Sequence, residues 1–159
     1  MLSAADRSIV RPTLASAAST AVVAMPAFLL GAFAPTIRED LDFGATALGA
    51  IFSFGFLVSV VVLQFGGLLA DTGGPRRGIR IGLFIAGCGA IGIGTLGRTY
   101  LLLVAFYGVS RVAEALVQPS GNSLISGLVA AERRGFAMGI KQAAVPLATA
   151  LSGIAVPLL

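Results

Sequence analysis

The chain has 159 residues, of which 57% are apolar and 11% charged, and its mean hydropathy is +0.96. Soluble domains contain roughly 45–50% apolar and about 25% charged residues, so this composition excludes an ordinary soluble fold and indicates a polytopic membrane protein. In such a protein the net charge of +4 reports topology, and we expect no nucleic-acid partner. The chain has no histidine and a single cysteine, which removes the usual zinc ligands and the base of His-dependent hydrolases. We therefore expect no enzyme activity, no metal and no cofactor.

Long apolar segments divide the chain into five predicted membrane spans. Each has about 20 or more residues, enough to cross a hydrocarbon core of roughly 30 Å as a helix. Lipid-exposed backbone must satisfy its own hydrogen bonds, so the spans must be helices, and short polar connections make consecutive helices antiparallel neighbours. The sequence therefore predicts an all-α transmembrane bundle. A cytoplasmic tail over 1–12 precedes the spans, which cover 13–36, 45–70, 78–97, 100–127 and 136–159.

The first apolar segment also has an alternative interpretation as a signal peptide. It follows basic residues and ends in Ala32-Phe33-Ala34, which resembles a cleavage site. The apolar region is too long for a signal peptide, however, and Pro35 directly after the cleavage point is a poor context. A retained membrane anchor is the better interpretation.

Basic residues are unevenly divided between the two sides of the membrane. If the N-terminus is inside, only Arg38 and Arg98 lie in outer loops. Because Lys and Arg concentrate in cytoplasmic segments, this asymmetry predicts a cytoplasmic N-terminus in the cell membrane. The cytoplasmic set would then be Arg7, Arg11, Arg76, Arg77, Arg80, Arg133 and Arg134.

The turn between the second and third spans carries a Gly-x-x-x-Asp-x-x-Gly pattern made by Gly67, Asp71 and Gly74, followed by the basic pair Arg76 and Arg77. An acidic outer loop precedes it, and a Gly-rich span and a span with an internal arginine follow. This order resembles the N-terminal six-helix half of a major facilitator superfamily transporter. The segment 131–139, Ala-Glu-Arg-Arg-Gly-Phe-Ala-Met-Gly, is similar to the loop that enters helix 5 in that family.

Two residues of the loop depart from the family pattern. Thr72 stands where a basic residue is common, and Pro75 stands where Arg or Lys usually follows the glycine, so the basic cluster is displaced. The resemblance implies that the loop is a gate, in which the Asp71 carboxylate meets a helix N-terminus of the other half and closes the inner side. It implies close helix approach at Gly67, a turn at Gly74, and anchoring of the loop at the membrane surface by its two arginines.

Ionisable residues inside spans are the candidates for substrate binding or proton coupling, because a charge near the bilayer centre costs roughly 2.5–3.5 kcal/mol. Arg111 lies about 16 Å into the fourth span, and Glu114 follows at i+3, so the two side chains can form an ion pair. This pair could serve only to neutralise itself, or Glu114 could carry a proton. The family resemblance favours a role for Arg111 in coupling or substrate binding. Lys141 and Gln142 lie near the start of the fifth span, and Gln118 and Asn122 are polar residues of the fourth that could add hydrogen bonds or serve as interface contacts.

The resemblance implies a secondary active transporter that works by alternating access. If Arg111 and Lys141 both face the cavity, their field favours a small organic or inorganic anion as substrate. Proton-coupled drug efflux is the alternative, although the fifth span lacks the adjacent Gly-Pro pair of such pumps. An alternative of another class is a non-transporting membrane scaffold or the product of a truncated pseudogene.

The family builds its carriers from two six-helix halves. With five predicted spans and an apolar end at Leu159, we expect the chain to be a fragment of a permease. Its expected partners are the lipid bilayer, a small-molecule substrate and the missing C-terminal half.

Overall fold

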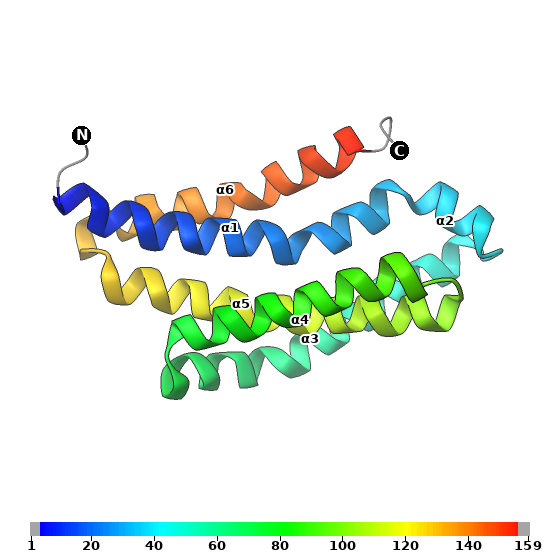
Figure 1. Cartoon of the computed structure of the whole chain (residues 1–159), viewed down its shortest axis with the longest axis horizontal. Coiled ribbons are helices and arrows are strands. Elements are labelled where there is room, and N and C mark those ends of the chain that lie inside the picture. Colours follow the sequence, from blue (N-terminus) through cyan, green and yellow to red (C-terminus); the bar gives the residue numbers. More distant parts are fainter. Residues whose placement is uncertain (1–3, 156–159) are drawn as a thin grey trace.

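The computed structural model describes residues 4–155, with side chains described from residue 9 onward. This part of the chain is a bundle of helices joined by short turns, with no strand among the described residues (Figure 1). The prediction of an all-α bundle is confirmed. The helices are α1 (Ala4–Ala32), α2 (Ala34–Asp40), α3 (Ala45–Gly73), α4 (Pro75–Leu96), α5 (Tyr100–Leu128) and α6 (Ala131–Ala155).

Four of the described helices are long and apolar enough to cross a membrane. They are Ile9–Ala32 within α1, and the whole of α3, α4 and α5. Helix α6 corresponds to the fifth predicted span and is 25 residues long, but it falls outside this set because its polar first turns, with Lys141 and Gln142 shortly after them, lower its hydropathy. The end of that predicted span, residues 156–159, lies outside the described part.

Helix ends differ from the predicted spans near the N-terminus. Helix α1 begins at Ala4, inside the segment expected to be a tail. It ends at Ala32 and gives way to the short helix α2, with Phe33 between them and Pro35 in the first turn of α2. Proline has no backbone N–H and a fixed φ, so it suits the first turn of a new helix. The outer loop expected after residue 36 is therefore partly helical.

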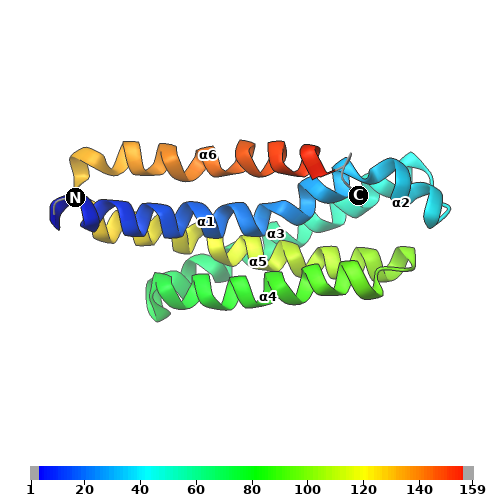
Figure 2. The same cartoon turned by 45° about the horizontal axis from the view of Figure 1, so that its top comes forward.

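Two groups of helices form the bundle (Figure 2). Helices α3 and α4 pack against α5, while α6 packs along α1, and the contact of α1 with α5 joins the groups. Helix α5 is the most buried of the candidate spans. Glycines bring α4 against α5: a Cβ on Gly78, Gly82 or Gly89 would lie within 2.5 Å of a side-chain atom of α5. Small residues allow such close approach in lipid, where apolar burial does not drive helices together.

The two ends of the bundle differ in charge. The start of α1, the α3–α4 turn and the α5–α6 turn share one end, and α2 and the α4–α5 turn share the other (Figure 1). We call the first the basic end. Its described basic residues are Arg11, Arg76, Arg77, Arg80, Arg133 and Arg134.

Candidate functional site

Arg111 lies in the middle of α5 and is only 8% exposed. Its guanidinium forms an ion pair with Glu114, which lies on the same face of the helix. Nε of Arg111 donates a hydrogen bond to Oγ of Ser59 on α3 at 3.1 Å. The guanidinium carbon lies 5.0 Å from the ring centroid of Phe56, within the range of a cation–π interaction. Arg111 is thus held by an anion, a hydroxyl and an aromatic ring from two helices.

Glycines on α3 create the space for this arrangement. A Cβ on Gly55 would lie 2.4 Å from Cε1 of Tyr107 and 2.8 Å from Cγ of Arg111. A Cβ on Gly66 would lie 2.3 Å from the carbonyl oxygen of Ala115. All three distances are shorter than the contacts that Cβ atoms make in proteins, so α3 reaches α5 at these points only because glycine has no side chain.

Arg111 lines two cavities. The first, of about 500 Å³, lies between α1, α3, α5 and α6, and Arg111 is the only charged residue among its described lining residues. Its walls are mainly apolar and aromatic, including Phe28, Phe52, Phe56 and Tyr107. The second, of about 280 Å³, is more polar and is lined by Ser59, Glu114 and Gln118 as well. Apolar walls with a few convergent polar groups are typical of small-molecule sites.

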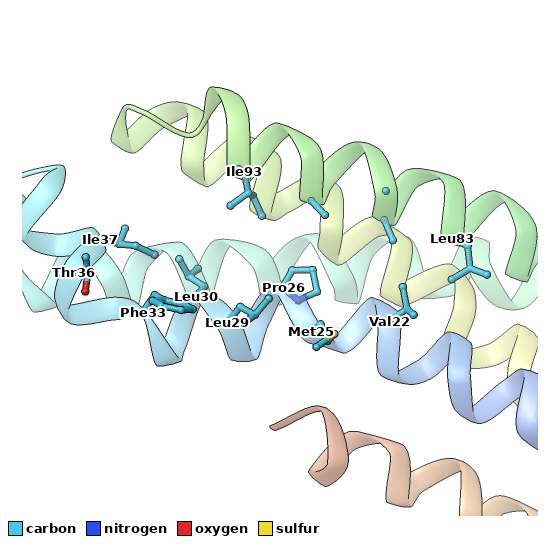
Figure 3. A pocket seen from close by; sticks show the side chains of 14 residues that line it. Val22, Met25, Pro26, Leu29, Leu30, Phe33, Thr36, Ile37, Leu83 and Ile93 are labelled. Carbon is cyan, nitrogen blue, oxygen red and sulfur yellow. The ribbon is translucent and has the colours of Figure 1, made fainter. Parts of the chain in front are cut away.

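A larger cavity lies elsewhere, between α1 and α4 (Figure 3). Its volume is about 750 Å³, and no charged residue is among its described lining residues. None of the residues singled out in the sequence as candidates for binding or coupling lines it. The cavities at Arg111 are smaller, but they are the ones lined by charged residues inside the bundle. We therefore place the candidate site at Arg111.

Lys141 on α6 is almost fully buried, at 1% exposure. Its Nζ donates hydrogen bonds to Oε1 of Gln118 at 2.6 Å and Oδ1 of Asn122 at 2.8 Å, both on α5. No carboxylate accepts from this ammonium within the described part of the chain. The hydroxyl of Ser16 on α1 and Cε of Lys141 both lie against Gly121, and the hydroxyls of Ser16 and Thr20 are buried without a described hydrogen-bond partner. The positive charge of Lys141 is thus solvated by neutral oxygens.

Gln118 connects the two charged groups that the sequence suggests separately. It accepts from Lys141 and lines the same cavity as Arg111 and Glu114. Gln142, in contrast, is exposed, and no side-chain hydrogen bond of Gln142 is found among the described residues. Of the four residues predicted for substrate binding or proton coupling, the structure therefore brings Arg111, Glu114 and Lys141 into one region.

The loop between α3 and α4 lies at the basic end, away from these charges. Gly74 joins the two helices with φ of 82°, a left-handed conformation that glycine adopts without a steric penalty. Asp71 lies in the last turn of α3, and Arg76 and Arg77 lie in the first turn of α4, all three exposed. Gly67 has open space where a Cβ would lie, so within the described residues no helix approaches closely there.

Sequence reasoning missed three residues around Arg111, namely Phe56, Ser59 and Tyr107. Ser59 had a weak signal, because it is a polar residue inside the most apolar span. Phe56 and Tyr107 gave no such signal, because aromatic residues at these spacings are common in any helix that faces lipid or the core.

Comparison with known proteins gives two matches. A family model described as Major Facilitator Superfamily matches residues 16–159. A protein of Cupriavidus necator, described as a probable sulfoacetate transporter, SauU, is 29% identical over 120 residues. These residues are 75% of this chain and 27% of the relative, so the chain spans about a quarter of the length of that protein.

Proposed function

Because the chain belongs to the Major Facilitator Superfamily, we propose that it forms part of a secondary transporter that carries a small organic anion by alternating access. One observation carries this proposal. Arg111 is buried in the middle of a candidate membrane span and lines the cavity that both helix groups share. A charge at this depth is costly to insert, and a guanidinium binds carboxylate-like groups through paired hydrogen bonds.

The charge balance of the region supports an anion. Arg111 and Lys141 contribute two positive charges, and Glu114 contributes the one negative charge among the described residues beside them. The difference leaves one uncompensated positive charge, which raises the local concentration of anions. The relative of Cupriavidus necator is described as a probable transporter of sulfoacetate, a small organic anion, and this agrees with the proposal.

We assign each residue a separate role. Arg111 contacts the anion, and Glu114 competes with it for the guanidinium, so a proton taken up by Glu114 releases Arg111 for the substrate. Lys141 is a positioning residue, since it acts through Gln118, which lines the cavity. Gln142 is a weaker candidate, because its side chain is exposed on α6.

An uptake experiment tests the proposed function. The full-length protein that contains this chain is reconstituted into liposomes and given labelled sulfoacetate, or a lipophilic cation such as tetraphenylphosphonium. Saturable uptake of the anion alone is expected. Transport of the cation instead would replace the proposal by drug efflux. Transport of neither would favour a scaffold.

We also propose that the α3–α4 loop gates the cytoplasmic side through the carboxylate of Asp71. Asp71 is exposed at the basic end and has no ion pair within the described residues, so it is free to meet another segment. Asp71→Asn should lower the uptake rate at least several-fold and leave the amount of protein in the membrane unchanged. Glu39→Asn, at the other end of the bundle, is the control. A normal uptake rate in Asp71→Asn would remove the gating role.

A further inference from the structure

Gln118 lies on the same face of α5 as Arg111. It follows Arg111 by seven residues, which is nearly two full turns and about 10 Å along the helix axis. Both residues line the cavity of about 280 Å³, with Glu114 between them. The ion pair with Glu114, one turn further along the helix, turns the guanidinium of Arg111 toward Gln118. One small molecule in this cavity can therefore contact both side chains.

Lys141 determines which end of the Gln118 amide faces this cavity. Its Nζ lies 2.6 Å from Oε1 of Gln118 and 3.4 Å from the backbone oxygen of the same residue. An ammonium has three N–H donors and no acceptor, so a glutamine beside it must present the oxygen of its amide. The reverse orientation would set N–H groups against N–H groups and lose a charge-assisted hydrogen bond. The amide of Gln118 is therefore fixed by a residue of another helix.

Nε2 of Gln118 consequently points away from Lys141 with two N–H donors. Within residues 9–155, Nε2 donates no hydrogen bond and is not fully buried. The carboxylate of Glu114, one turn earlier on α5, is paired with Arg111 instead. Because the contact of Lys141 with Gln118 joins α6 to α5, the orientation of the amide does not depend on what else surrounds the cavity.

A site with both Arg111 and Gln118 binds a narrower class of anions than a guanidinium alone. Arg111 can hold one anionic group through paired hydrogen bonds, and Nε2 of Gln118 offers donors for a further oxygen. Phe56, Val60 and Leu63 make the neighbouring walls apolar. An anion with one charged end and an apolar remainder would leave the donors of Gln118 without an acceptor, which costs free energy away from water. An anion with oxygen atoms at both ends would satisfy both side chains.

We propose that Gln118 is a specificity-determining residue of the transport site, which selects anions with a second oxygen-bearing group, and that Lys141 holds its amide in the donor orientation. The selection requires an anion on Arg111 and so rests on the proposed function. Lys141 acts as a positioning residue in this arrangement, since it contacts Gln118 and leaves the anion to the two residues of α5.

Two sulfonates of similar size test the proposal. Sulfoacetate has a carboxylate where ethanesulfonate has a methyl group, so the ratio of their affinities measures the contribution of the second group. Titration calorimetry on the full-length protein that contains this chain gives both affinities. Gln118→Leu changes no charge. It should lower the ratio by about tenfold or more, the effect of losing a hydrogen bond to a charged group, and leave the affinity for ethanesulfonate nearly unchanged.

Asn122→Leu is the matched control. Asn122 accepts a hydrogen bond from the same ammonium at 2.8 Å, but it is not among the described residues that line the cavity. This variant should keep the affinity ratio of the unaltered protein. Equal losses in the two variants would show that both amides serve only to solvate Lys141, and would overturn the proposal. An unchanged ratio in Gln118→Leu would overturn it as well.

A double-mutant cycle with Lys141→Met tests the orienting role. Without the ammonium the amide of Gln118 can turn either way, so Gln118→Leu should lower the ratio less in this background than in the unaltered protein. Equal reductions in both backgrounds would remove the role of Lys141.

The same measurements separate the specificity of the site from its function. Binding of sulfoacetate that depends on Arg111 but keeps its ratio in Gln118→Leu would overturn the role of Gln118 alone. Binding of neither sulfonate would remove the proposed function together with the role of Gln118.

Discussion

The guanidinium of Arg111 can stay charged inside the bundle because three different kinds of contact stabilise its charge. Glu114 supplies the counter-charge, Ser59 accepts a hydrogen bond from Nε, and Phe56 covers the guanidinium. The ammonium of Lys141, in contrast, donates its described hydrogen bonds to the amide oxygens of Gln118 and Asn122 and to no carboxylate. The first cation is compensated and the second is only solvated, which leaves the region positive.

Glu114→Gln tests the first of these arrangements. The change removes the counter-charge and leaves the buried Arg111 beside a neutral amide. We expect a loss of about 2 kcal/mol in the free energy of unfolding, between the values for surface and buried ion pairs. Denaturation of the protein in mixed micelles measures it. The control Glu132→Gln, exposed at the start of α6, should cost less than about 1 kcal/mol, and equal losses in both variants would contradict the account.

Part of this site can be predicted from sequence for a simple reason. A charged residue inside an apolar span is conspicuous, and the i+3 spacing of Arg111 and Glu114 puts both on one face whatever the tertiary structure. The contacts of Arg111 with Ser59 and Phe56 depend on how α3 crosses α5, which no local pattern contains. The link from Lys141 to Gln118 likewise requires that α6 pack near α5.

At the scale of the helices, glycine positions decide how closely two elements approach. The family resemblance suggests close approach at Gly67, yet its neighbour Gly66 is the glycine in contact with α5. The two residues are adjacent in sequence and about 100° apart around the helix, so only one of them can face α5. The same substitution at Gly66 and at Gly67 therefore separates the effect of helix packing on stability from the effect of helix propensity.

We predict opposite effects of alanine at these two positions. In Gly66→Ala the new Cβ would lie 2.3 Å from the backbone oxygen of Ala115, so α3 must move away from α5. Overpacking of this kind typically costs about 1–3 kcal/mol. Gly67→Ala meets open space within the described residues and should stabilise α3 by up to about 1 kcal/mol. Thermal denaturation of both variants in detergent measures the difference, and equal stabilities would show that α3 and α5 are not in close contact here.

Helix existence follows from composition, while helix ends depend on local chemistry. The long apolar segments predict α3, α4 and α5 within a few residues. The break between α1 and α2 was missed, because Pro35 can begin a helix as well as end one. The apolar segment over 136–159 also predicts a helix where α6 lies. Hydropathy does not predict which of its polar residues is buried, because Lys141 and Gln142 are buried and exposed according to the face on which they lie.

At the scale of the whole molecule, the two helix groups enclose the cavity lined by Arg111 at mid-bundle and gather most arginines at one end. The excess of basic residues at this end supports our proposal that it is cytoplasmic. Thr72 lies at the basic end and Thr46 at the opposite one, and both are exposed.

Cysteine labelling tests the proposed orientation. In a background with Cys88→Ser, Thr46→Cys should react with a membrane-impermeant maleimide in intact cells, and Thr72→Cys should react only after lysis. Neither substitution alters the charge of the loops. The reverse pattern would place the basic end outside.

The central claim is that Arg111 binds a small organic anion, and titration calorimetry with sulfoacetate tests it most directly. Loss of a charge-assisted hydrogen bond costs about 1.5–3 kcal/mol, so Arg111→Gln should weaken the affinity at least tenfold. Lys141→Met should weaken it less, since it acts through Gln118. Arg98→Gln, at the opposite end from the arginine-rich turns, should bind as tightly as the unaltered protein. Undiminished affinity in Arg111→Gln would contradict the account.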